Sequence, residues 1–200
     1  MKRIATRRET MERQQKMRSL WRIAELGVIL AVCCAILHAQ GRPNEYQVKA
    51  VYLYNFTRFV EWPAADAGAE GPFAICVLGD DPFGTALDST VAGETVRGRN
   101  VVARRVGKAE DARICRILYV SSSEDGKWKE ILTALGKSSV LTVSDMPKFS
   151  ERGGMIEFVA KGDKVRFEVN LTNTTEAGLT LSSDLLKVAV GVKGNAHPGD

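Results

Sequence analysis

The sequence predicts a single three-layer α/β domain, in which a mainly parallel central sheet is flanked by helices and ends in an antiparallel hairpin. After residue 45, short apolar runs typical of buried strands alternate with stretches of helical periodicity. Near the end, two runs of alternating apolar and polar residues flank Gly162 and Asp163, which indicates a hairpin. About 160 residues remain once an N-terminal leader is set aside, and this length suits one domain.

The first expected element is a helix over residues 46–63, which ends at Trp62 and Pro63. Its apolar arc consists of Val48, Tyr52, Leu53, Phe56, Phe59 and Val60. Its polar side consists of Gln47, Thr57, Arg58 and Glu61. Asn55 interrupts the apolar arc and needs partners, since a buried unpaired amide costs about 1–3 kcal/mol. The arc is wider than one sheet face requires, so a dimer mate or another partner protein is expected to cover the excess, with Tyr54 as the candidate contact.

A strand is expected at Phe73–Leu78, and Asp81 and Pro82 are expected to cap and begin a helix that runs to about Ser89. The later elements follow from periodicity and turn residues. They are a polar strand over 94–105 with a bend at Gly98, a buried strand over 113–120, a helix over 124–135 capped by 121–123, a strand over 140–143, a helical turn over 148–152, a hairpin of 155–161 and 164–171, and a last helix from Ser182 or Ser183 to about Val190.

The first 39 residues have the composition of an export signal. They contain eight Lys or Arg and three Asp or Glu, and residues 23–37 are almost wholly apolar. This run is shorter than the roughly 20 residues that span a membrane, so cleavage after Ala39 is favoured over an anchor. We therefore expect a signal at 1–39, the folded domain at 40–191 and a flexible tail at 192–200. Removing the leader takes +5 from the total charge of +4 and leaves −1, which removes the support for nucleic-acid binding.

Four cysteines are present, of which Cys33 and Cys34 lie in the leader. Cys76 and Cys115 each lie in a strand-like run, and in an oxidising compartment they predict a disulfide. Closing this loop would stabilise the fold by about 4 kcal/mol in the loop-entropy model. The alternative is a pair of buried free thiols.

Candidate catalytic groups do not assemble into a recognisable constellation. The two histidines, His38 and His197, lie in the leader and the tail, so a histidine base or a zinc ligand is not expected within the fold. The loop 79–84 lacks the spacing of a nucleotide-binding loop, and Pro82 removes an N–H group that a phosphate would use. Four glutamates are candidates for an acid–base pair, but nothing in the sequence brings together any two of Glu61, Glu94, Glu157 and Glu168. We therefore expect no enzyme, no metal and no cofactor.

Several motifs resemble the YfiR family of exported bacterial regulators over residues 45–189. They are YQVKAVYLYNFTRFVEWP, ICVLGDDPFG, CRILYVSSSE, VLTVSDMPKFSERGGMIEFV, KVRFEVNL and LSSDLLKVA, in this order. The resemblance implies a periplasmic α/β protein that can dimerise and that holds a membrane-bound diguanylate cyclase inactive by binding its periplasmic sensor region, which lowers cyclic-di-GMP. It also implies a Cys76–Cys115 disulfide. A second cysteine pair, expected around Ser150 and Glu157, is absent from this chain.

The leading hypothesis is therefore a periplasmic inhibitor that acts by occupying part of an inner-membrane signalling protein. Its binding surface is expected on the outward face of the hairpin, at Arg166 and Glu168, with Met155 and Phe158 nearby. The alternative is a small-ligand-binding module that serves a sensor kinase or another membrane signalling protein. In that case the strand ends at 79–81 and 121–123 would line the ligand crevice.

Overall fold

The computed structural model describes residues 44–63 and 71–194, and all of them belong to one unit that begins at Asn44. The expected leader, with Cys33, Cys34 and His38, lies outside the described residues, and so does His197. Residues 192–194 of the expected tail are described. Among the described helices, none is long and apolar enough to span a bilayer.

Strands and helices alternate along most of the described chain. The strands are β1 (Val60–Glu61), β2 (Phe73–Leu78), β3 (Thr95–Val96), β4 (Arg99–Val106), β5 (Ile117–Val120), β6 (Leu141–Ser144), β7 (Ile156–Lys161), β8 (Lys164–Asn170), β9 (Thr180–Leu181) and β10 (Gly191–Lys193). The α-helices are α2 (Glu45–Phe59), α4 (Thr85–Val91), α5 (Trp128–Leu135), α6 (Leu171–Glu176) and α7 (Ser183–Val188). The 3-10 helices are η1 (Glu110–Ile114), η2 (Ser122–Lys127) and η3 (Ser150–Arg152).

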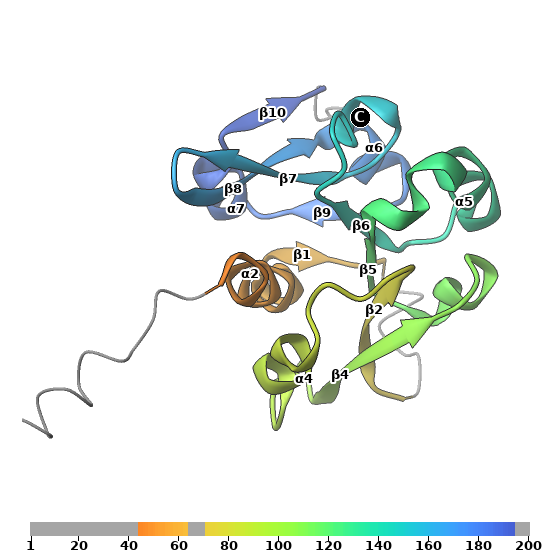
Figure 1. The fold of residues 1–200 in the computed structure, drawn as a ribbon, viewed down its shortest axis with the longest axis vertical. Helices are drawn as coiled ribbons and strands as arrows, with labels where there is room; N and C mark the ends of the chain where they lie inside the picture. The colour runs from red at the N-terminus through yellow and green to blue at the C-terminus, as the bar shows by residue number, and fades with distance from the viewer. Residues whose placement is uncertain (1–43, 64–70, 195–200) are drawn as a thin grey trace, which may run out of the picture. The chain divides into compact units, whose positions relative to one another are not determined.

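Eight of these strands form the main sheet, in the order β10-β8-β7-β6-β5-β2-β4-β3, and β1 pairs separately with β9 (Figure 1). β2 pairs in parallel with β4 and β5, and the parallel run continues through β6 to β7. β7 and β8 form the antiparallel hairpin, with Lys161 opposite Lys164. The prediction of one α/β domain with a mainly parallel sheet and an antiparallel hairpin is therefore confirmed.

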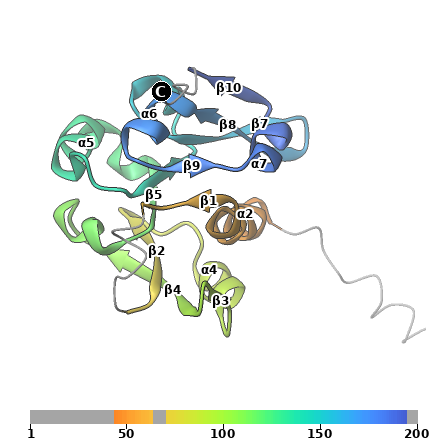
Figure 2. The same cartoon turned by 180° about the vertical axis from the view of Figure 1, so that it is seen from behind.

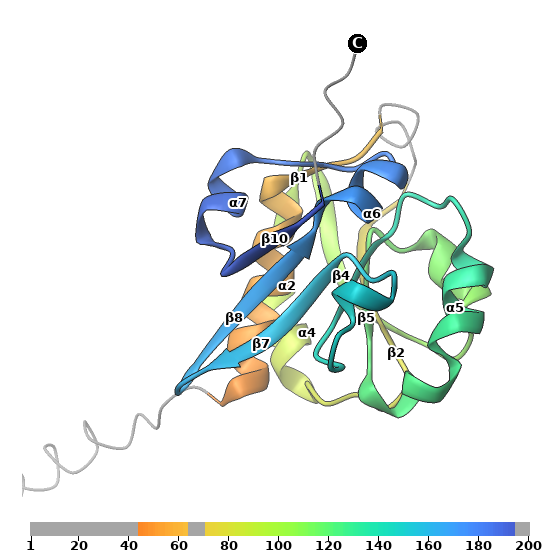
Figure 3. The ribbon, with the colours of Figure 1, turned by 90° about the horizontal axis from the view of Figure 1, so that it is seen from above.

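Two cores lie on the two faces of this sheet, because successive strand residues point in opposite directions. Ile75 and Val77 of β2 belong to the core that α2, α4 and α7 cover. Cys76 and Leu78 belong to a second core, which contains residues of α5. Figure 2 and Figure 3 show α2 and α5 on opposite sides of β2 and β5.

The helix α2 ends at Phe59, four residues before the expected end. Val60 is extended and pairs with Leu181, and Glu61 pairs with Thr180, so a tertiary strand pairing replaces the last helical turn. Thr57, expected on the polar side, is buried, and its hydroxyl donates to the Tyr54 carbonyl oxygen at 2.6 Å. Phe59, expected in the apolar arc, is exposed.

Other helices and strands begin or end at residues that differ from the predicted ones. The Asp81 carboxylate accepts from the Phe83 N–H at 2.8 Å, so the chain turns first and α4 begins only at Thr85. The helix expected over 124–135 is divided into η2 and α5, since Gly126 disfavours a continuous α-helix. The strand expected over 113–120 begins only at Ile117, after η1. The sequence did not predict α6, β9 or β10.

Cys76 in β2 and Cys115, just before β5, are joined by a disulfide with Cα atoms 5.9 Å apart. Both residues are buried in the core that contains α5. The bond therefore fixes the start of β5 against the neighbouring strand β2, in agreement with the pairing expected from the sequence.

Candidate functional site

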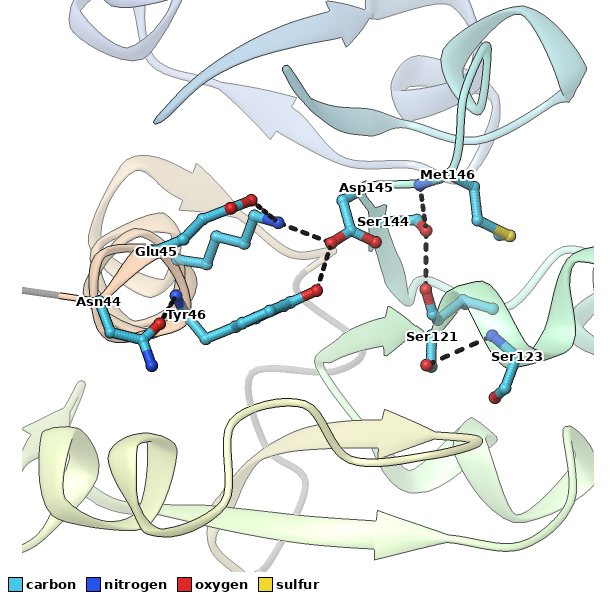
Figure 4. Close-up of polar contacts among 10 residues, drawn as sticks. Asn44, Glu45, Tyr46, Ser121, Ser123, Ser144, Asp145 and Met146 are labelled. Carbon is cyan, nitrogen blue, oxygen red and sulfur yellow. Dashed lines mark hydrogen bonds and ion pairs between the residues drawn. The ribbon is translucent and has the colours of Figure 1, made fainter. Parts of the chain in front are cut away.

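A charged cluster lies where the first turns of α2 meet the carboxyl ends of the parallel strands. Asp145 follows β6 directly and accepts from two residues of α2, as Figure 4 shows. The Lys49 Nζ lies 2.6 Å from the Asp145 Oδ2, and the Tyr46 hydroxyl donates to the same oxygen at 3.1 Å. Lys49 also pairs with Glu45 at 2.5 Å, one turn earlier. The side chains of Lys49 and Asp145 are only 3% and 16% exposed, so this is a largely buried ion pair.

Aromatic rings enclose this ion pair. The Lys49 Nζ lies 4.4 Å from the centre of the Tyr46 ring, a distance that allows a cation–π interaction. Phe83 meets the edges of Tyr46 and Tyr119, with ring centres 5.6 and 4.7 Å apart. Water therefore has little access to the Lys49–Asp145 pair, and the electrostatic attraction between these charges is stronger than at the surface.

The pKa values in the cluster move so as to preserve the ion pair. Burial acts to raise the pKa of Asp145, but the hydrogen bond and charge of Lys49 outweigh it, and the pKa is lowered. Burial acts to lower the pKa of Lys49, but its hydrogen bonds with Asp145 and Glu45 outweigh it, and the pKa is raised. Burial, followed by the charge of Asp145, raises the pKa values of Tyr46 and Tyr119. Together Lys49, Asp145 and Tyr46 form a clamp that holds α2 on the sheet.

The two strand ends expected to line a ligand crevice are brought together by the fold. They lie on either side of the point where the chain order of the parallel strands reverses, between β2 and β5. The Ser123 hydroxyl accepts from the Asp80 N–H at 2.9 Å. A Cβ atom on Gly79 would lie 2.4 Å from the Ser123 Oγ, so the two loops are in close contact. A ligand at this position would have to separate them.

Ser144 ties the same edge together from β6. Its hydroxyl donates to the Val120 carbonyl oxygen at 2.7 Å and accepts from the Met146 N–H at 3.1 Å (Figure 4). The Ser121 hydroxyl caps η2 through the Ser123 N–H. Ser121 therefore has the capping role that its sequence context predicts, and Ser144, for which no role was predicted, hydrogen-bonds the backbone at the strand ends.

Ser150 and Glu157, the positions around which the family's second cysteine pair was expected, touch each other through hydrogen bonds. The Ser150 hydroxyl and N–H donate to the Glu157 Oε2 at 2.8 and 3.0 Å. The Lys148 N–H donates to the other carboxylate oxygen at 2.9 Å. Both Ser150 and Glu157 are buried. These hydrogen bonds form a polar cross-link that joins η3 to β7.

The sequence-predicted surface residues fall into two groups. Tyr54 is half-buried and its hydroxyl donates to Glu94, so it joins α2 to the turn after α4. Arg166 and Glu168 are half-buried, and the Glu168 carboxylate lies 3.0 Å from the Lys193 Nζ of β10.

Met155 and Phe158, the other two expected contacts, are core residues with 7% and 4% exposure. The ring of Phe158 packs against Phe56 and Tyr52 of α2. A partner therefore cannot reach these two side chains without local opening of the hairpin.

The sequence did not single out the residues that α2 exposes. Val51 is 48% exposed and Phe59 is 39% exposed, and half-buried Asn55 lies between them at a spacing of four residues. We call Val51, Asn55 and Phe59 the α2 outer stripe. Of its residues only Phe59 belongs to the expected apolar arc, and Asn55, which interrupts that arc, is tolerated because it is only half-buried.

The sequence did not predict the clamp either, although the position of Lys49 on the helix gives one indication of it. Lys49 precedes Leu53 and Phe56 at helical spacing and therefore lies on the buried side of α2. A lysine in that position needs an anionic partner, but nothing local identifies Asp145, which lies 96 residues away.

Family comparison matches residues 46–190, and the chain belongs to the YfiR/HmsC-like family. This is a family of periplasmic regulators of diguanylate cyclase signalling, whose members are regulators and not enzymes. The match covers nearly all of the described domain.

Among solved structures, a conserved domain protein from Vibrio cholerae O1 biovar El Tor is similar, with a TM-score of 0.50 and 14% identity over 74% of this chain. The ABC domain in complex with L-Trp from Streptococcus pneumonia has a TM-score of 0.45 and 14% identity over 60% of this chain. The chain covers 60% and 55% of the length of these two proteins, and the first similarity concerns the fold alone. No curated protein matches significantly.

Proposed function

We propose that this protein binds the periplasmic sensor region of an inner-membrane diguanylate cyclase and holds the enzyme inactive, which lowers cyclic-di-GMP. The observation that carries the proposal is the family match over residues 46–190. Binding would shift the cyclase toward its inactive conformation by the difference in affinity for the two states. Release of the inhibitor then restores cyclase activity.

The α2 outer stripe is the surface that we propose for the cyclase. Its apolar residues, Val51 and Phe59, lie on a helix that the Lys49–Asp145 clamp and the Tyr54–Glu94 hydrogen bond hold in place. A helix that is already fixed loses little conformational entropy when a partner binds, so more of the contact energy remains as affinity. Tyr54 then acts by positioning α2 rather than by direct contact.

The outer face of the hairpin is a second, polar part of the proposed surface. Glu168 is paired with Lys193, whereas Arg166 donates to its neighbour's backbone, the Val165 carbonyl oxygen, at 3.0 Å. Half-buried charges of this kind contribute specificity and association rate more than affinity. We therefore assign the main binding energy to the α2 outer stripe.

Site-specific photo-crosslinking in cells tests this surface. A photoreactive amino acid at Val51 or Phe59 should crosslink to an inner-membrane protein that contains a diguanylate cyclase domain. The same amino acid at Val188, which is 60% exposed on α7, is the control and should give no such product. A product of twice the mass of this protein would instead assign the stripe to a homodimer, and equal crosslinking from Val188 would remove the surface assignment.

We further propose that residues 1–39 direct export and are removed, so that the exported protein begins at Gln40. The charge and apolar pattern of the leader support this step. The N-terminal sequence of the protein recovered from the periplasm should begin at or near Gln40. Recovery of uncleaved protein in the membrane fraction would contradict it.

A further inference from the structure

One segment of this nearly neutral domain is strongly basic. Residues 97–116 contain seven Lys or Arg and two Asp or Glu, a net charge of +5. The rest of the chain after Ala39 carries a net charge of −6. The two carboxylates of the segment, Glu110 and Asp111, lie in η1, after strand β4 has ended. Three of the seven cations, Arg99, Arg104 and Arg105, lie on β4, and Lys108 follows two residues after its end, so positive charge near this strand would attract an anionic partner.

The strand β4 lies at the margin of the main sheet (Figures 1 and 2). On its inner side it pairs with β2 from Val101 to Val106. On its outer side β3 pairs only with Arg99 and Asn100, and the Val101 N–H donates to the Glu94 carbonyl oxygen. Within the described residues no strand pairs with this side of residues 102–106. Successive residues of a strand direct their N–H and C=O groups to opposite sides, so the backbone groups on the outer side of residues 102–106 belong to Ala103 and Arg105.

The cations along this edge differ in whether they are neutralised. The Arg105 guanidinium pairs with Asp81 and Asp88, both at 2.7 Å, on the face that α4 covers. Arg104 points to the opposite face and is exposed, as is Lys108 just beyond the strand. Within the described residues, neither the Arg104 guanidinium nor the Lys108 ammonium makes a side-chain hydrogen bond or ion pair. Two exposed cations thus flank an open strand edge.

We propose that the outer edge of β4 is a docking site for an acidic, extended segment of a partner protein, which adds to the sheet as a further strand. Open backbone groups on the edge supply the hydrogen bonds of strand addition. Arg104 and Lys108 select acidic side chains on one face of the added strand. The site lies apart from the α2 outer stripe in sequence and uses none of its residues, so this inference goes beyond the proposed function.

A charged edge also prevents indiscriminate pairing. Lys and Arg side chains on an open edge discourage two copies of the same sheet from joining, because like charges would face each other. An acidic strand escapes this repulsion and gains attraction instead. The same residues therefore exclude self-association and admit one class of partner.

Fluorescence anisotropy with labelled decapeptides tests the site on the purified protein. The probe is a peptide that alternates Glu and Thr, which is acidic and favours an extended conformation. One comparison peptide alternates Lys and Thr, and another carries Pro in place of two central Thr residues, which removes backbone donors. We expect binding of the Glu–Thr peptide, weaker binding at high salt because of screening, and at least tenfold weaker binding of both comparison peptides.

Matched charge reversals locate the site. The double variant Arg104→Glu/Lys108→Glu should weaken binding of the Glu–Thr peptide about tenfold or more. The control Lys161→Glu/Lys164→Glu changes the net charge equally at exposed positions of the β7–β8 hairpin and should change binding less than twofold. Thermal melting of both variants checks that they fold.

Four outcomes would overturn the proposal. Absence of binding by the Glu–Thr peptide removes the site, and equal binding by the proline peptide removes strand addition. Equal effects of the two double variants remove the assignment to β4. Binding of vesicles that contain anionic phosphatidylglycerol, lost on Arg104→Glu/Lys108→Glu while the peptide does not bind, would show that this edge faces a membrane instead.

Discussion

Replacing Asp145 by Asn should destabilise the domain strongly, because it removes the anion of a largely buried ion pair and leaves Lys49 with less compensation. Removing one partner of a buried pair costs about 3–5 kcal/mol. The Asp145 side chain keeps 16% exposure and Lys49 retains Glu45, so we expect a smaller loss of about 2–3 kcal/mol. With a urea dependence of about 1–3 kcal/mol per molar, the unfolding midpoint should fall by roughly 0.7–3 M.

Urea titration followed by tryptophan fluorescence measures this change, since Trp62 and Trp128 are both buried. A double-mutant cycle with Lys49→Met should give a coupling energy above about 1 kcal/mol. The matched control is the pair Lys187–Asp184, whose side chains are both 71% exposed and which should couple by less than about 0.5 kcal/mol. A loss below about 1 kcal/mol for Asp145→Asn, or a coupling no larger than in the control, would refute the clamp.

Three further predictions follow from the same geometry. The pKa of Asp145 is lowered in the folded state, so its contribution to stability is present above its unfolded pKa of 3.8 and is lost as pH falls through the lowered value. Asp145→Asn should therefore reduce the acid sensitivity of the unfolding midpoint between about pH 5 and 2. An unchanged pH profile would contradict this. The pKa of Lys49 is raised in the folded state, so its contribution to stability is present below pH 10.5 and is lost as pH rises through the raised value. Lys49→Met should therefore flatten the fall in stability above about pH 10.5. Glu157→Gln should lower the free energy of unfolding by about 1–3 kcal/mol, since an amide has one acceptor oxygen for three donors. The control Glu151→Gln, on the exposed side of η3, should lower it by less than about 0.5 kcal/mol. Equal losses in urea titrations would show that the polar cross-link has no special role.

Those parts of the fold that have a strong local pattern could be predicted from the sequence. β2 is an unbroken apolar run between Pro72 and Gly79, and every one of its residues is buried. The β7–β8 hairpin follows from alternation on both sides of Gly162, which adopts a positive φ of 60° as the turn requires.

The elements that escaped prediction are short and exist only through tertiary pairing. β1 and β9 have two residues each and are strands because they pair with each other across more than 100 residues of chain. β10 has three residues, of which Lys193 bonds to η3 and β8 through Ser150, Glu151 and Glu168. No local periodicity can reveal such elements.

Candidate site residues were predictable in the same uneven way. The Cys76–Cys115 pair follows from its compartment and its strand-like surroundings, and the structure joins these two residues. Surface residues were harder, because an alternating strand does not say which face is outward: Phe158 lies under α2, whereas its neighbour Glu157 is buried on the other side. The α2 outer stripe depends on how α4 and α7 flank the helix, which the sequence does not contain.

The concentration of cyclic-di-GMP in cells tests the central claim most directly. Deleting the gene should raise cyclic-di-GMP, and expression of the intact protein should restore the original level. The variant Val51→Asp/Phe59→Asp, present in the periplasm at the same abundance, should fail to restore it, whereas Val188→Asp should succeed. An unchanged cyclic-di-GMP concentration in the deletion strain would contradict the account.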